Sequence, residues 1–136
     1  MAAFHFELVS PEKLLFSGDV EQIDVPGAEG DFGVLADHAP MVTTLRPGIL
    51  TVHGSGGEQK IVVLGGFAEV SPEGLTVLAD VAEAVDDIDR GMITARIGEL
   101  EGRIAKMDLS AELDKLITRL DHFKEVDRYL TGTAAH

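Results

Sequence analysis

Apolar and polar residues alternate with a period of two through much of the first 85 residues, as in strands with one buried and one wet face. Ile23 and Val25, for example, alternate with Gln22 and Asp24. Turn residues separate the short apolar runs at regular intervals, and this spacing predicts a β-sandwich. About ten strands are expected, at residues 4–9, 13–16, 20–25, 31–35, 41–45, 49–53, 59–64, 67–70, 75–79 and 82–85.

The pattern changes to helical spacing after residue 85. A first helix is expected to be capped by Asp86 and Asp87, and a second helix by Ser110. Two amphipathic helices with a brief connection predict an antiparallel α-helical hairpin. The apolar stripes are formed by Ile93, Ile97, Leu100 and Ile104 in the first helix and by Leu113, Leu116, Ile117, Leu120 and Phe123 in the second.

These patterns divide the chain into an N-terminal sandwich, residues 1–85, and a C-terminal helix-turn-helix, residues 86–136. Within the second part we expect residues 131–136 to form a disordered tail. The distribution of charge agrees with two different surfaces. Residues 1–87 carry three basic and fifteen acidic side chains, whereas residues 88–136 carry eight basic and nine acidic ones.

The composition excludes several classes of function. A formal net charge of -13 argues against binding to nucleic acid, because phosphate contacts need clustered basic residues. The chain has no Cys, which excludes disulfide frameworks and thiol catalysis. The longest apolar run, at residues 61–64, is far shorter than the roughly 20 residues of a membrane helix, so direct membrane insertion is not expected.

Two local features could carry chemistry. Gly27, Gly30 and Gly33 recur at three-residue spacing, which suits tight turns or, alternatively, an anion cradle. Asp37 and His38 could perform acid-base chemistry in a hydrolase, but adjacent residues of an extended chain point in different directions and no nucleophile lies nearby in sequence. We therefore expect contact roles, with no catalytic residue. The carboxylates are scattered over exposed positions, so no calcium or magnesium site is expected. No cofactor is expected either.

The order and spacing of several motifs resemble the epsilon subunit of bacterial F-type ATP synthases. That family has a ten-stranded β-sandwich followed by a helical hairpin, in agreement with the architecture expected from periodicity. The motifs are Pro26-Gly27, Gly30, Gly33-Val34-Leu35, His38-Ala39-Pro40, Pro47-Gly48, Phe16-Ser17-Gly18, and the segments 64–70 and 76–80.

The resemblance implies a non-catalytic subunit of the central stalk, which helps to couple proton-driven rotation of the c-ring to ATP synthesis. Asp31 would face the c-ring, and Ser10, His38 and Thr43 would lie on or near the surface that faces the gamma subunit. The alpha and beta subunits would be further partners, reached by the hairpin. The implied location is peripheral, at the cytoplasmic face of the bacterial inner membrane.

Some relatives carry an Ile-Asp-x-x-Arg-Ala motif for ATP at the first helix. This chain reads Ile-Asp-Arg-Gly-Met-Ile from residue 88, so ATP binding is not expected. The alternative is a nucleotide-sensing module with a mobile hairpin, in which Asp89, Arg90 and Arg96 would form the site. Acidic residues also interrupt the basic ones on the second helix, and we therefore expect weak inhibition of ATP hydrolysis at most.

Overall fold

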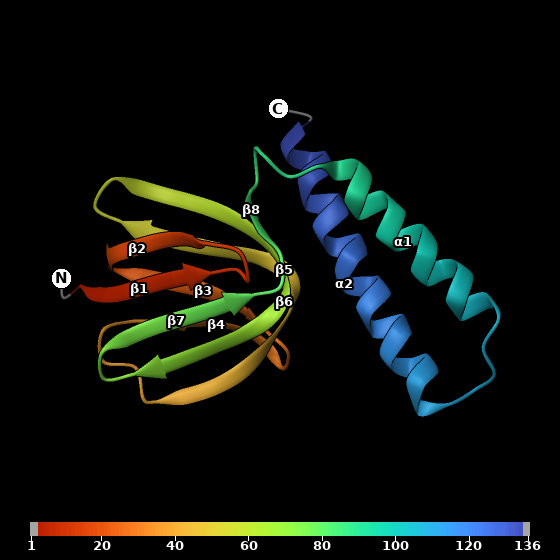
Figure 1. Ribbon diagram of the computed structural model, residues 1–136, viewed down its shortest axis with the longest axis horizontal. Coiled ribbons are helices and arrows are strands. Elements are labelled where there is room, and N and C mark those ends of the chain that lie inside the picture. The colour runs from red at the N-terminus through yellow and green to blue at the C-terminus, as the bar shows by residue number, and fades with distance from the viewer. Residues whose placement is uncertain (1–2, 135–136) are drawn as a thin grey trace. The chain divides into compact units, whose positions relative to one another are not determined.

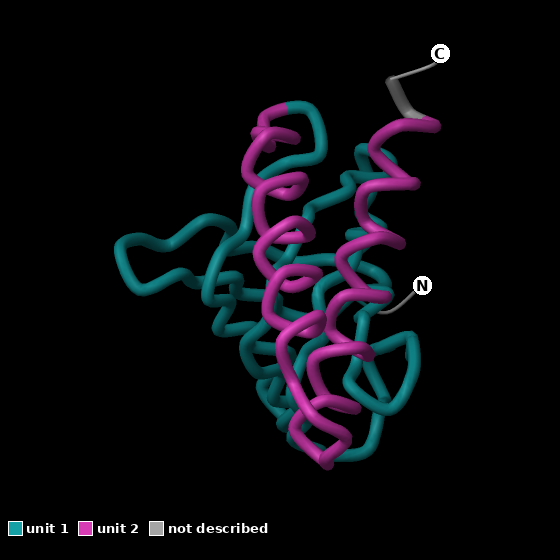
Figure 2. The backbone as a smooth tube through the Cα atoms, turned by 90° about the vertical axis from the view of Figure 1, so that its right-hand side faces the viewer, with its two compact units in different colours: residues 1–86 teal, residues 87–136 magenta. Residues whose placement is uncertain are grey.

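The computed structural model describes residues 3–134, which form eight strands and two helices (Figure 1). The chain divides into two compact units, residues 1–86 and residues 87–136, coloured teal and magenta in Figure 2. The first unit contains all of these strands and the second contains both helices. The predicted fold class, a β-sandwich followed by an α-helical hairpin, is confirmed.

The strands of the first unit follow one another in the order β2-β1-β7-β6-β5-β3-β4, and β8 pairs with β6. The pairing of β1 with β7 is parallel, and the other pairs are antiparallel. The strands are β1 (Phe4–Val9), β2 (Leu14–Val20), β3 (Gln22–Gly27), β4 (Gly30–Val34), β5 (Met41–Gly54), β6 (Gly57–Ser71), β7 (Gly74–Ala79) and β8 (Ala82–Ala84).

The number of strands differs from the expected ten because β5 and β6 each join two expected strands. The gaps expected at residues 46–48 and 65–66 contain Pro47 and three glycines, but both long strands continue through these positions. Gly65 and Gly66 adopt φ values of 112° and 129°, which bend β6 without ending it. The register of β5 with β6 skips Arg46, which lies between the pairs of Leu45 and Pro47.

The bends in β5 and β6 divide the sheet into two layers. The first layer contains β2, β1, β7, the end of β6 and the start of β5, and the second contains β8, the start of β6, the end of β5, β3 and β4. The core lies between their inner faces. Phe6, Val77 and Ile23 are among its residues, each with 0% of its surface exposed. The alternation of apolar and polar residues along the strands therefore separates the side chains that face the core from those that face outward.

The second unit is a hairpin of α1 (Arg90–Ala105) and α2 (Ala111–Ala134). Ser110 caps α2 as predicted, because its Oγ accepts the Leu113 amide N–H at 3.1 Å. The predicted cap of α1 at Asp86 and Asp87 is wrong. The N-cap is Asp89, whose carboxylate accepts the Gly91 amide N–H at 2.8 Å, and the two earlier aspartates lie in a turn.

The end of α2 extends further than the sequence predicted. Residues 131–134 were expected in a disordered tail, but they continue the helix, and residues 135–136 lie outside the described part. Thr131 Oγ1 donates to the Asp127 carbonyl at 2.8 Å and accepts from Arg90 Nη2 at 2.7 Å. Leu130 is 3% exposed. The hydrogen bond from Arg90, the first residue of α1, and the burial of Leu130 offset the poor helix propensity of Thr and Gly.

Candidate partner-binding surface

A row of apolar side chains crosses the outer face of the first layer. The register pairs Phe67 with Leu78, Leu78 with Val9 and Val9 with Leu14, so these four residues are neighbours on β6, β7, β1 and β2. Phe67, Leu78 and Leu14 are 54%, 52% and 58% exposed. We call these four residues the apolar row. A contiguous exposed apolar patch is typical of a site where a partner binds.

Strand periodicity and one bulge produce the apolar row. Ala68, Val77 and Leu8 point into the core, so their chain neighbours on β6, β7 and β1 point outward. The register of β1 with β2 shifts between Leu8 and Val9, and this bulge places Leu14 opposite Val9. The row is not apparent from the sequence, because its members come from four separate segments and only the register shows that they are neighbours.

Polar and acidic residues flank the apolar row. Two residues further along the same strands, the register aligns Glu69 of β6 with Thr76 of β7 and Thr76 with Glu7 of β1. Val42 of β5, which is 67% exposed, pairs with Glu69 and extends the apolar area. An apolar centre with a charged rim has the anatomy of a protein–protein interface. A complementary partner would present apolar side chains flanked by basic ones.

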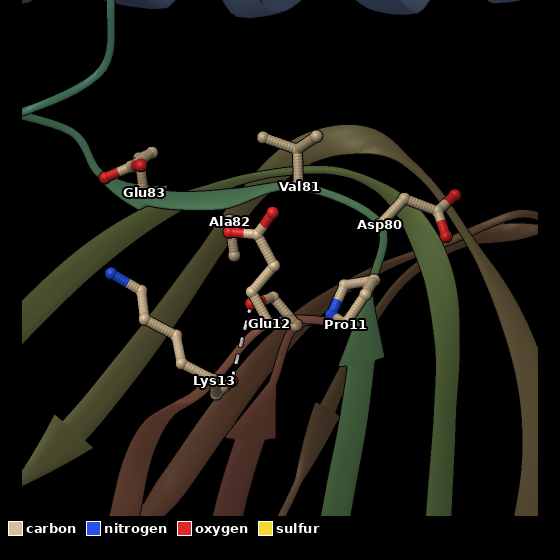
Figure 3. A pocket seen from close by; sticks show the side chains of 8 residues that line it. Pro11, Glu12, Lys13, Asp80, Val81, Ala82 and Glu83 are labelled. Carbon is tan, nitrogen blue, oxygen red and sulfur yellow. Dashed lines mark hydrogen bonds between the residues drawn. The ribbon is translucent and has the colours of Figure 1, made fainter.

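Ser10 lies in the tight turn between β1 and β2. Its amide N–H donates to the Lys13 carbonyl at 2.9 Å, and its Oγ donates to the same oxygen at 3.4 Å. The turn forms one wall of a hollow of about 270 Å³, and residues 80–83 form the other. In Figure 3, Glu12 and Lys13 extend from the turn toward the opposite wall, which carries Asp80 and Glu83. Among residues 3–134 no group of His, Asp and Glu side chains is arranged to hold a metal ion.

His38 and Thr43 belong to other segments than Ser10: His38 precedes β5, and Thr43 lies on it. The His38 ring is 6.2 Å from the Phe32 ring, centroid to centroid, and its Nδ1–H donates to the Ala39 carbonyl at 2.6 Å. Thr43 is on β5, where its Oγ1 donates to the Thr44 carbonyl at 3.2 Å. Between β5 and β1, which Ser10 follows, lie β6 and β7. The three residues expected near the gamma subunit thus belong to different segments of the sandwich, and β6 and β7, which carry Phe67 and Leu78 of the apolar row, lie between Thr43 and Ser10 in the sheet order.

Asp31, the residue expected to face the c-ring, is the second residue of β4 and pairs with Pro26 of β3. Its side chain is 74% exposed, and its Oδ1 accepts a hydrogen bond from Arg46 Nη2. Arg46 Nη1 also donates to the Gly27 carbonyl at 2.6 Å. The carboxylate is thus held from one side and open to solvent on the other.

The residues of the alternative nucleotide site have other partners or do not converge. Asp89 caps α1, and Arg90 Nη2 lies 3.1 Å from Asp127 Oδ1 and 2.7 Å from Thr131 Oγ1. Arg96 follows Arg90 by six residues, which on an α-helix is a rotation of roughly 240°, so the two guanidinium groups leave different faces of α1. A phosphate at Arg90 would have to displace an internal carboxylate.

The outer face of the second layer carries a polar network around His53. Its Nε2–H donates to Asp24 Oδ2 at 2.7 Å, and its Nδ1 lies 3.5 Å from Glu58 Oε2. Gln22 Nε2 donates to Asp24 Oδ1 at 2.7 Å. Burial opposes ionisation of the Asp24 carboxyl, but the hydrogen bonds from His53 and Gln22, together with the electrostatic attraction of His53 and Lys60, outweigh it and lower its pKa below the ordinary value.

The lowered pKa of Asp24 predicts a stability that depends on pH. The folded carboxylate remains charged at a lower pH than the unfolded one, so its contribution is present above about pH 4 and is lost as the pH falls through the folded pKa. We expect Asp24→Asn to lower the Tm at pH 6 by about 2 to 5 °C. The difference from the wild type should shrink below about pH 4. Thermal melts monitored by circular dichroism from pH 3 to 7 measure it, and a difference independent of pH would contradict the assignment.

Residues 3–85 match the family described as ATP synthase, Delta/Epsilon chain, beta-sandwich domain, which defines the class of the first unit. The whole chain is 60% identical over 136 residues to ATP synthase epsilon chain 1 of Nitrobacter hamburgensis and to the ATP synthase epsilon chain of Rhodopseudomonas palustris strain BisA53. Each alignment covers 100% of both chains. The chain therefore belongs to the ATP synthase epsilon-chain family, and the resemblance inferred from the sequence motifs is confirmed.

Two solved structures share the fold. One is a chain of the Euglena gracilis mitochondrial ATP synthase structure that contains OSCP, F1 and the c-ring, with a TM-score of 0.71 and 26% identity. The alignment covers 100% of this chain and 83% of the Euglena chain. The other belongs to the central stalk and c-ring structure of the Tetrahymena thermophila mitochondrial ATP synthase, with a TM-score of 0.61 and 16% identity. This alignment covers 96% of this chain and 95% of the Tetrahymena chain. At that identity the second likeness shows the fold alone.

Proposed function

We propose that this chain is a rotor subunit of an ATP synthase central stalk, which transmits rotation without catalysing a reaction itself. In this proposal the apolar row binds the foot of the gamma subunit and Asp31 faces the c-ring. The observation that carries the proposal is the apolar row. Family membership and the likeness to a chain of an assembled F1 and c-ring support the choice of partners.

The apolar row has the dimensions of an interface centre. Neighbouring strands lie about 4.8 Å apart, so four strands in a row present apolar groups over roughly 14 Å. Large apolar side chains near the centre of an interface contribute most of the binding free energy, and a polar rim around them excludes water. Glu69 and Glu7 supply such a rim beside the row, and we infer that the gamma surface is apolar with basic residues at its edge.

The c-ring contact rests on Asp31. This carboxylate is 74% exposed on β4, and it suits a contact with basic residues in the polar loops of a c-ring. Within residues 3–134 no helix is long and apolar enough to cross a membrane. The proposed location is therefore peripheral, at the cytoplasmic face of the bacterial inner membrane, where the partners hold the subunit.

The hairpin has a minor regulatory role in this proposal. Its helices are tied to each other by Arg90 with Asp127, and by Lys124 with Glu101 at 3.6 Å. The acids between the basic residues of α2 dilute any attraction to acidic surfaces of the alpha and beta subunits. We infer that inhibition of ATP hydrolysis by the hairpin is weak.

Co-purification with the cognate gamma subunit tests the central claim. We expect the full-length chain and gamma to elute as a 1:1 complex in size-exclusion chromatography. Separate elution at micromolar concentrations would overturn the proposed function. Calorimetric titration of the chain with ATP tests the alternative, and heat consistent with a low-micromolar Kd would favour the nucleotide-sensing module.

A further inference from the structure

Arg46 joins two parts of the sandwich that are distant in sequence. One guanidinium nitrogen donates to the Gly27 carbonyl at 2.6 Å and the other to Asp31 Oδ1. The Arg46 side chain is 17% exposed, whereas that of Asp31 is 74% exposed. The arginine is thus largely enclosed by the fold, and the carboxylate that it holds is at the surface.

The bend in β5 explains why an arginine can reach this place. Arg46 falls between the register pairs of Leu45 and Pro47 with β6, where β5 passes from the first layer to the second. The turn between β3 and β4 lies beside it, since Gly27 pairs with Leu45 and the Ala28 amide N–H donates to the Thr44 carbonyl at 2.9 Å. The two guanidinium nitrogens of Arg46 therefore bridge the Gly27 carbonyl, where the turn begins, and the Asp31 carboxylate, just after the turn.

The turn itself leaves little room for another arrangement. A Cβ on Gly27 would lie 2.8 Å from the Gly30 carbonyl oxygen and from the Phe32 ring. The backbone is therefore packed closely on one side, and Arg46 holds its carbonyl on the other. Asp31 has two oxygens, and the hydrogen bond to Oδ1 leaves Oδ2 for a second cation.

We propose that Arg46 is a positioning residue for the c-ring contact: it locks the β3–β4 turn and fixes the Asp31 carboxylate so that Oδ2 faces outward. This inference rests on the proposed function, in which Asp31 meets a basic c-ring loop. A side chain that is already ordered loses less entropy when a partner binds, and this preorganisation strengthens binding.

Arg46 also has an opposite electrostatic effect, because its charge partly cancels that of Asp31. The two effects are of similar size at an exposed site, so the substitutions must separate them. Lysine keeps the charge but lacks the two-pronged donor, whereas glutamine loses the charge as well. If positioning dominates, both substitutions weaken binding. If cancellation of charge dominates, lysine is neutral and glutamine strengthens binding.

The test uses the full-length chain and the cognate c-ring assembled with gamma in detergent. We expect Arg46→Lys and Arg46→Gln each to raise the Kd about three- to tenfold. Asp31→Asn should weaken binding as well, and in its presence the Arg46 substitutions should have little further effect. NMR order parameters of the amides of residues 27–31 should fall in both Arg46 variants. Lys60→Gln is the matched control, because it removes one positive charge from the sandwich at a residue that pairs with Glu58 instead.

Each outcome bears on a stated part of the proposal. Unchanged or tighter binding by both Arg46 variants, with Asp31→Asn still weakened, would overturn the positioning role and leave the c-ring contact intact. Unchanged binding by Asp31→Asn would overturn the c-ring contact, and the inference with it, without affecting the gamma complex. Should Arg46→Gln melt below the assay temperature, Arg46→Lys and the order parameters decide the question.

Discussion

Replacing Leu78 with aspartate is expected to weaken the complex with the gamma subunit about 100-fold, or about 3 kcal/mol. Leu78 lies between Phe67 and Val9 in the middle of the apolar row. An aspartate there would have to lose its hydration against an apolar partner surface. The other three residues of the apolar row are uncharged and cannot pair with it. Titration of gamma by surface plasmon resonance or calorimetry measures the change in Kd.

The fold should tolerate this substitution, since Leu78 points away from the core and is 52% exposed. Exposed positions of this kind usually change the stability by less than about 0.5 kcal/mol. The matched control is Leu109→Asp, which introduces the same charge at a leucine that is 93% exposed between the two helices. We expect the control to change the Kd less than about twofold. Equal effects of the two variants would show that net charge, not the apolar row, determines the affinity.

Local sequence patterns predicted the strands and the helical stripes because each depends on residues that are close in the chain. Period-two alternation placed Ile23 and Val25 on a buried face, and both are buried in the core. The expected strands divided β5 at residues 46–48 and β6 at residues 65–66, because a glycine or proline that bends a strand has the same local signature as one that ends it. Only the pairing with neighbouring strands distinguishes the two cases.

Contacts between distant residues account for the features that the sequence did not predict. The last turn of α2 depends on Arg90, which is 41 residues away from Thr131 in the chain. The apolar row likewise depends on the register of four strands, and each of its members resembles an ordinary exposed apolar residue when considered alone. The partner of Asp31 was not apparent either, since Arg46 is 15 residues away and reaches it through the bend in β5.

The second large effect is expected at Gly66, where Ala should lower the free energy of unfolding by about 3 to 5 kcal/mol. A Cβ at this position would lie 2.0 Å from the Leu78 carbonyl oxygen and 2.8 Å from the Ala79 Cα. Both contacts are with backbone atoms that the β6–β7 hydrogen bonds hold in place, so the clash cannot be relieved by moving a side chain. The φ of 129° adds strain, because residues other than glycine rarely adopt this backbone angle.

Thermal unfolding followed by the sheet signal in circular dichroism measures this effect, and a fall in Tm of roughly 15 °C or more is expected. Gly56→Ala is the control within the same unit, since a Cβ at Gly56 meets nothing within 4 Å. The Tm of this variant should differ from that of the wild type by only a few degrees. A small effect at Gly66 would mean that β6 and β7 can separate locally. In that case Phe67 and Leu78, which pair directly beside Gly66, would not be held together as a rigid binding surface.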